Sequence, residues 1–156
     1  METRRIAKSE LGELLVLYRD LHDSDDPLPE PRVINRVWDR IQSDPNQCYF
    51  GAYVDRRLVS SCVLSVIPNL TRGCRPYGVI ENVVTHKDYR RRGLGRSVLQ
   101  TALTHAWAFD CYKVMLLTGR KTEPIFRFYE SAGFDRHAKQ AFVAKPPATK
   151  GVASGR

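Results

Sequence analysis

A turn with two glycines, placed between a predicted strand and a predicted helix, constrains the fold of this chain more than any other feature. The run Gly78–Thr85 is short and mostly apolar, as is typical of a strand. The turn Tyr89-Arg-Arg-Arg-Gly-Leu-Gly-Arg-Ser97 follows it, and the segment from Gly93 to Phe109 then has apolar residues at helical spacing. These residues are Leu94, Val98, Ala102 and Ala106. A strand that leads directly into a helix favours an α/β fold.

The other elements are predicted from hydrophobic periodicity and from turn residues. In chain order, the sequence predicts helices over 6–21 and about 33–41, strands over 48–54, 58–67 and 78–85, the helix over 93–109, a strand over 113–118, a helix over 122–132 and a final strand over 134–144. Residues 55–57 are expected to form a hairpin turn. The order is ααβββαβαβ, which predicts a single α/β domain with a mixed, mostly antiparallel sheet flanked by helices.

The length of 156 residues and the hydrophobic content of 42% suffice for one domain with a sizeable core. We expect this domain to span 1–145, and residues 146–156, rich in Pro, Gly, Ala and Ser, to form a disordered tail. The four cysteines lack C-x-x-C spacing and are expected to be reduced thiols. No uninterrupted apolar run approaches the ~20 residues of a membrane span. We therefore expect a cytoplasmic protein without a membrane partner.

The charge of the chain is unevenly distributed. Its formal net charge is +8, but residues 1–30 have eight acidic and four basic side chains, whereas residues 31–156 have nine acidic and twenty-one basic ones. A basic body favours a phosphate-bearing partner, which can be a nucleic acid, a membrane surface or a nucleotide cofactor. Composition alone does not choose among these three.

The two-glycine turn has the chemistry of a diphosphate site. The first turn of a helix leaves backbone N–H groups unpaired, and the helix dipole there favours an anion. Gly93 and Gly95 remove side chains that would keep phosphate oxygens away from these amides, and Arg91, Arg92 and Arg96 add charged donors. The pattern lacks the Gly-Lys-Ser/Thr of a Walker loop and the third glycine of the dinucleotide fingerprint. The alternative is a solvated basic turn in which the glycines serve only chain geometry.

The residues around this turn carry a family resemblance. Arg90-x-x-Gly93-x-Gly95 after the strand Ile80-Glu-Asn-Val-Val-Thr85 resembles the acyl-CoA-binding signature of the GNAT N-acetyltransferase superfamily. The segments Cys111–Thr118 and Phe128-Tyr-Glu-Ser-Ala-Gly-Phe134 are similar to the family's next strand and helix. In these motifs, the chain looks most like the glucosamine-6-phosphate N-acetyltransferase branch. The resemblance covers about residues 48–144.

The resemblance implies a single-domain GNAT-type fold, acetyl-CoA as co-substrate, and transfer of the acetyl group to a primary amine of a small molecule through a tetrahedral intermediate. It implies that Val83, Val84 and Thr85 offer backbone groups to the pantetheine arm. The pyrophosphate would be held along the turn, by the amides of Arg91 through Arg96, within the cofactor-binding segment Arg90, Arg91, Arg92, Gly93, Leu94, Gly95, Arg96 and Ser97. A bulge at Asn82 or Val83 would turn a backbone N–H toward the acetyl oxygen.

Two residues are the catalytic candidates. Glu81 is a candidate base for the acceptor amine, and it can equally be a structural carboxylate bonded to the backbone or to an arginine. Tyr129 matches the family tyrosine near the thioester sulfur, and a phenol of pKa ~10 suits a thiolate whose parent thiol has a pKa of ~8.5. The alternative role of Tyr129 is core packing, because it shares a predicted helical face with Ile125, Phe128 and Ala132.

The segment Gly119–Ile125 departs from the pattern of the sugar-phosphate branch, because it is longer and begins with basic residues. Arg120 and Lys121 can contact an acidic acceptor, contact a cofactor phosphate or face solvent. The four histidines lack the spacing of metal ligands, so no metal site is predicted. The alternative to an enzyme is a non-catalytic module that binds CoA or nucleic acid, although the arginines lack interleaved aromatic residues that would stack on bases. Nucleic acid is therefore not the expected partner, and a homodimer remains open.

Overall fold

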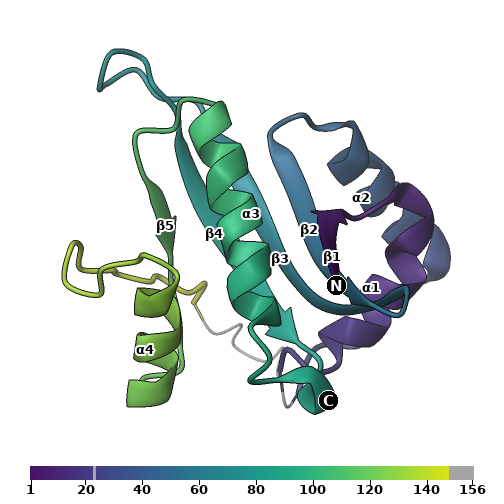
Figure 1. The fold of residues 1–156 in the computed structure, drawn as a ribbon. Coiled ribbons are helices and arrows are strands. Elements are labelled where there is room, and N and C mark those ends of the chain that lie inside the picture. The colour runs from purple at the N-terminus through teal and green to yellow at the C-terminus, as the bar shows by residue number, and fades with distance from the viewer. Residues whose placement is uncertain (23, 148–156) are drawn as a thin grey trace, which may run out of the picture.

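The computed structural model describes residues 1–22 and 24–147, and it contains a five-stranded sheet with helices on both faces (Figure 1). The strands are β1 (Glu2–Arg5), β2 (Gln47–Val54), β3 (Arg57–Ile67), β4 (Tyr77–Thr85) and β5 (Val114–Leu116). The helices are the 3₁₀ turns η1 (Lys8–Glu10) and η2 (Lys87–Tyr89) and the α-helices α1 (Leu11–Tyr18), α2 (Pro31–Ser43), α3 (Leu94–Ala108) and α4 (Glu123–Ser131). The strands are ordered β1-β2-β3-β4-β5, and all neighbours are antiparallel except β4 and β5. The predicted mixed α/β sheet is confirmed.

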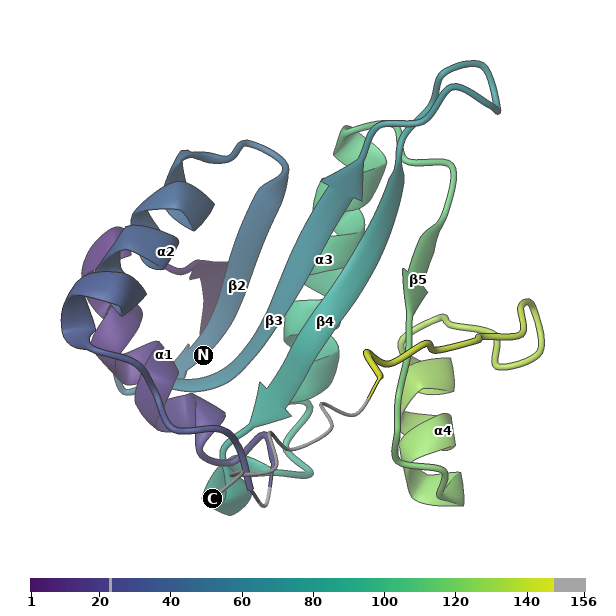
Figure 2. The ribbon, with the colours of Figure 1, turned by 180° about the vertical axis from the view of Figure 1, so that it is seen from behind.

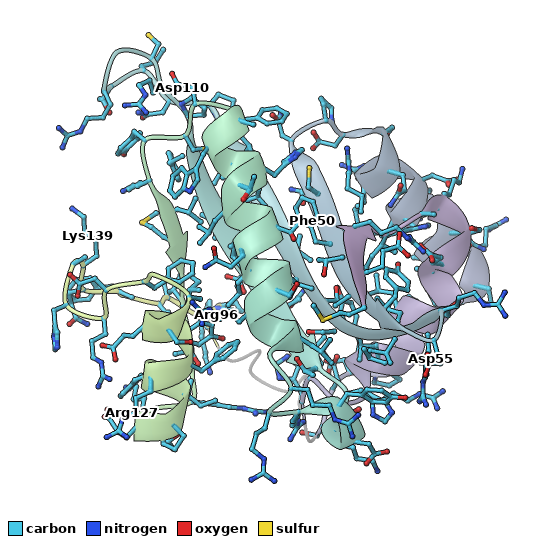
Figure 3. All side chains as sticks on the ribbon, in the orientation of Figure 1. Phe50, Asp55, Arg96, Asp110, Arg127 and Lys139 are labelled. Carbon is cyan, nitrogen blue, oxygen red and sulfur yellow. The ribbon has the colours of Figure 1, made fainter. Side chains whose placement is uncertain are left out.

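The sheet has an apolar core on each face. On one face α3 packs over the sheet, and Phe50 lies between the two (Figure 3). The stripe predicted for this helix is buried there, with Val98 at 0% exposure. On the other face, Leu14 and Leu17 of α1 and Trp38 of α2 form the second core. Burial of these faces anchors each helix to the sheet.

The turn between β2 and β3 consists of Asp55 and Arg56. Val54 pairs with Arg57, and the two turn residues have φ angles of 50° and 64°. Two consecutive positive φ values are the mark of a type I′ turn, whose twist matches that of the flanking strands. The predicted hairpin over 48–67 is confirmed.

Strands β4 and β5 pair over a short stretch and then diverge (Figure 2). Three residue pairs join them, and the last is Ile80 with Leu116. Strand β4 continues to Thr85, so its second half has no partner on the β5 side among the described residues. The sheet therefore has an open strand edge in its interior.

Strand β4 also contains a bulge. Ser61 of β3 pairs with Val84, and Val63 pairs with Glu81, so two residues of β4 lie opposite Cys62 alone. One of the two, Asn82, has a φ of 52°, in the left-handed region. The bulge lies where the family resemblance implied it.

The N-terminal part of the chain differs from the expectation in two respects. Strand β1 was not predicted, because Glu2–Arg5 is a polar edge strand without alternation. The helix predicted over 6–21 is shorter and is preceded by η1. The reason is Glu10, whose carboxylate accepts hydrogen bonds from the Ala7 N–H at 2.6 Å and from Arg4 at 2.8 Å, and so fixes a separate turn before α1.

The final strand predicted over 134–144 is wrong. Residues 134–147 contain no strand, and Phe142 and Val143 are 91% and 74% exposed. An extended segment becomes a strand only where a neighbour completes its ladder, and no described strand pairs with this one. The observed order is therefore βααβββαβα. Residues 148–156 of the predicted tail lie outside the described residues, so the boundary at 145 stays a prediction.

Candidate active site

A cavity of about 710 Å³ lies where β4 and β5 separate. Five segments line it: the residues just after α1, the second half of β4, the glycine turn with the start of α3, the end of β5 with the loop after it, and α4. Most of the predicted site residues come together here, including Glu81, Tyr129, Val83, Gly93 and Gly95. A shallower depression of about 870 Å³ on the outer face of α2 contains none of them.

The glycine turn uses its two glycines differently. Gly93 caps α3 with a φ of 78°, a conformation that favours glycine, and a side chain there would meet no atom within 4 Å. Gly95 instead permits close packing, because a Cβ there would lie 3.1 Å from the Phe128 ring and 3.2 Å from the Thr85 hydroxyl. Chain geometry thus explains both glycines, and the same geometry leaves the start of α3 open to the cavity.

The start of α3 has free donors for an anion. The first hydrogen bond within the helix runs from the Ser97 N–H to the Gly93 carbonyl at 3.0 Å, so the amides of Leu94, Gly95 and Arg96 have no partner within the helix. Arg96 lies on the side of α3 that faces α4 (Figure 3), and Arg91 also lines the cavity. This arrangement fits a diphosphate.

Three of the predicted cofactor-binding residues have other partners. Arg92 stands over the Tyr89 ring at 5.1 Å, and the Ser97 hydroxyl lies 2.8 Å from that of Thr3, so neither side chain lines the cavity. Arg90 lines it but donates to the Thr85 carbonyl at 3.2 Å and to the Asp20 carbonyl at 3.4 Å. Arg90 therefore ties the end of β4 to the segment after α1.

Tyr129 reaches the cavity from α4. It is half-buried and lies next to Phe128, with 4.9 Å between the ring centroids. Burial raises the pKa of Tyr129, the positive charge of Arg120 opposes this rise, and the Glu81 carboxylate adds to it. The phenol consequently keeps its proton at neutral pH and can donate it to a neighbouring anion.

Glu81 projects from β4 into the same cavity and is exposed. Within the described part of the chain, its carboxylate makes no hydrogen bond or ion pair. The alternative role of Glu81, a structural carboxylate bonded to an arginine or to the backbone, is therefore not observed among the described residues. The carboxylate is free to bind a cationic amine or to accept its proton.

The structure adds three cavity residues that the sequence did not single out, namely Asp20, Leu21 and His22 in the segment after α1. Arg120, which the sequence did single out, lines the cavity from the loop after β5. The sequence left three roles possible for Arg120. In the structure, one of its guanidinium nitrogens donates a hydrogen bond to the Leu21 carbonyl at 3.3 Å. No spacing rule connects positions 20–22 with position 120, so only the fold could bring them together.

Among the described residues, no group of three His, Cys, Asp or Glu side chains is arranged to hold a metal ion. None of the helices in that part could span a bilayer, since none combines sufficient length with an apolar sequence. All four cysteines are free thiols.

The sequence model of the acetyltransferase (GNAT) family matches residues 13–134. Glucosamine 6-phosphate N-acetyltransferase of Trypanosoma brucei brucei is 39% identical over 140 residues, which cover 90% of this chain and 92% of the relative. A solved chain of Agrobacterium tumefaciens str. C58, assigned as an acetyltransferase, has a TM-score of 0.87 and 38% identity, with 94% of this chain and 100% of that one covered.

The crystal structure of glucosamine-6-phosphate N-acetyltransferase from Arabidopsis thaliana has a TM-score of 0.81 over 93% of this chain and 97% of that one. At 20% identity, this second structural likeness concerns the fold alone.

Proposed function

This chain belongs to the acetyltransferase (GNAT) family, and from that premise we propose that its acceptor is glucosamine 6-phosphate. Family membership makes it an acetyl-CoA-dependent N-acetyltransferase that acts on an amine. The alternative of a non-catalytic module is not favoured. The observation that carries the choice of acceptor is the 39% identity to the Trypanosoma enzyme, which extends over nearly the whole length of both chains.

The charges in the cavity support this acceptor. The free Glu81 carboxylate suits the ammonium group of an amino sugar. Arg120 suits the phosphate of the amino sugar, because the N–H donors of a guanidinium match phosphate oxygens. Arg120 forms no ion pair with a carboxylate of the described residues, so its charge is available. Aminoglycosides, the substrates named for several structural relatives, have many positive charges and would meet Arg120 unfavourably.

Each predicted residue then has a defined task. The free amides of Leu94–Arg96 and the side chains of Arg91 and Arg96 bind the pyrophosphate, and the open edge of β4 pairs with the pantetheine arm. Bound acetyl-CoA supplies an acetyl thioester, whose carbonyl carbon an amine can attack. The Val83 N–H at the bulge would stabilise the negative charge that develops on the acetyl oxygen.

Glu81 and Tyr129 carry out the two proton transfers of the reaction. Glu81 takes a proton from the acceptor amine as the C–N bond forms, directly or through water. Tyr129 donates its hydroxyl proton toward the sulfur, which receives the electron pair of the breaking C–S bond. Turnover leaves an N-acetylated acceptor and free CoA.

A thiol-release assay tests the acceptor. The panel pairs glucosamine 6-phosphate with glucosamine, and adds spermidine, lysine and an aminoglycoside. We expect kcat/KM for glucosamine 6-phosphate to exceed that for glucosamine about 100-fold or more, as loss of a charged contact implies. Mass spectrometry identifies the product. Equal rates on the two sugars, or a higher rate on another amine, would refute the proposed acceptor. A homodimer, a cytoplasmic location and the lack of a nucleic-acid partner remain predictions.

A further inference from the structure

The bulge in β4 holds a residue in an unfavourable backbone conformation. Asn82 has a φ of 52°, and a residue with a side chain enters this left-handed region only at some cost, although asparagine does so more readily than most. Asn82 lies between Glu81 and Val83, and all three line the cavity. The conformation of Asn82 therefore sets where the carboxylate and the Val83 amide point.

Tyr18, the last residue of α1, approaches this bulge from the face of the sheet that α1 and α2 cover. Its hydroxyl faces the side chains of Asn82 and Ser61, which are close enough to influence its pKa but lie outside hydrogen-bonding geometry. The hydroxyl oxygens of Tyr18 and Ser61 are both completely buried, and neither has a partner among the described residues. Buried polar groups are nearly always bonded, so two such hydroxyls beside a strained residue require an explanation.

Packing does not explain the Tyr18 hydroxyl. Leu14 and Leu17 already supply the fully buried apolar side chains of α1, and a phenylalanine ring would fill the space of the Tyr18 ring equally well. Burial raises the pKa of Tyr18, so the hydroxyl keeps its proton and remains a donor. The Asn82 side chain has a carbonyl oxygen that can accept this proton in a hydrogen bond.

We propose that Tyr18 is a positioning residue of the active site, whose hydroxyl bonds the Asn82 side chain when the cavity is filled and holds β4 in its bulged conformation during acetyl transfer. Hydrogen bonds in active sites are often long in the free protein and tighten in the substrate complex. A hydrogen bond that Tyr18 makes only in the substrate complex would stabilise the complex relative to the free protein. The inference rests on the proposed role of the bulge in acetyl transfer, but not on the identity of the acceptor.

Tyr18→Phe tests this role, with Tyr53→Phe as the matched control. Tyr53 belongs to the same apolar core, but its hydroxyl already donates to Glu10 at 3.0 Å. For Tyr18→Phe we expect kcat to fall about 10-fold or more, with KM for acetyl-CoA within about 2-fold. The Tm of the free protein should be equal or higher, because the lost hydroxyl has no partner there. For Tyr53→Phe we expect the opposite pattern, a lower Tm and an unchanged kcat.

Asn82→Gly provides the second test. Glycine adopts the positive φ without support from a side chain, so adding Tyr18→Phe to this variant should lower kcat less than about 2-fold. Three results would overturn the proposal. Tyr18→Phe could lower kcat equally in the wild type and in Asn82→Gly, it could leave kcat unchanged, or it could lower kcat and Tm together. Amide hydrogen exchange at residues 81–84 with CoA bound needs no acceptor, and it should be faster in Tyr18→Phe than in the wild type. The kinetic arm uses whichever amine the wild type acetylates, so failure of glucosamine 6-phosphate alone leaves this test intact.

Discussion

Arg120 donates a hydrogen bond to the backbone carbonyl of Leu21 at 3.3 Å, across 99 positions of sequence. The bond joins the loop after β5 to the segment after α1, and both segments line the cavity. It uses one of the five N–H donors of the guanidinium, so the others are available for an anion in the cavity.

Arg120→Gln should therefore impair recognition of the acceptor phosphate. We expect kcat/KM for glucosamine 6-phosphate to fall about 10- to 100-fold, mainly through KM, because charge-assisted hydrogen bonds are lost. The rate on glucosamine should stay within about 2-fold, since that acceptor has no phosphate to lose. Arg127→Gln is the control: Arg127 pairs with Glu123 on the exposed side of α4. An equal loss on both sugars would show that Arg120 supports the fold and does not read the phosphate.

Glu81→Gln tests the proton acceptor. The amide keeps the size of the side chain but cannot take a proton, so kcat should fall about 100-fold or more. Binding of acetyl-CoA, measured by calorimetry, should not change, because Glu81 is not among the residues proposed to bind the cofactor. A variant that keeps most of its kcat would assign the proton to another group.

Tyr129→Phe should lower kcat about 100-fold, with little change in the affinity for acetyl-CoA. The packing of the ring against Phe128 is preserved, so only the proton donor is lost. Burial raises the pKa of Tyr129, so activity that depends on the protonated phenol should persist through pH ~10 and decline only above it. Rates measured from pH 6 to 11 check this, and unchanged turnover in the phenylalanine variant would leave Tyr129 with a packing role only.

Alanine at the two glycines of the turn should give different results. Gly95→Ala pushes a Cβ against the Phe128 ring and the Thr85 hydroxyl, and we expect weaker CoA binding by about 10-fold because the start of α3 must shift. Gly93→Ala meets no atom but strains a φ of 78°, so it should cost about 1–2 kcal/mol of stability. Calorimetry with CoA and thermal unfolding separate the two effects. Identical behaviour of both variants would contradict the distinct roles.

Glu10 should make stability depend on acid pH. Its hydrogen bonds to Arg4 lower the pKa of Glu10 to about 2, against ~4.3 in the unfolded chain. The folded state thus binds fewer protons, and the stabilisation is complete above pH ~5 and disappears as the pH falls toward 2. Glu10→Gln should therefore lower Tm at pH 7, and the difference from wild type should narrow between pH 5 and 2. A difference that is constant over that range would exclude the ion pair as its source.

The sequence predicted those parts of the fold and site that depend on local patterns. The hairpin over 48–67 and the helix capped by Gly93 follow from periodicity and turn residues, and the amides at the start of that helix have no partner within it. Contacts between distant segments were not predictable in this way. Asp20 and Arg120 share a cavity only because α1 and the loop after β5 meet at the same edge. The strand expected over 134–144 failed for the same reason, since a strand depends on a neighbour that local sequence does not specify.

Phe128, which packs against Gly95, is also the chain neighbour of Tyr129. The contact between Phe128 and Gly95 therefore helps to set the spacing between the amides that would hold the diphosphate and the phenol that would face the sulfur. With the turn and the phenol in their proposed roles, this spacing would determine the length of pantetheine that fits between them. A longer or shorter thioester arm would reach the phosphate end or the phenol, but not both.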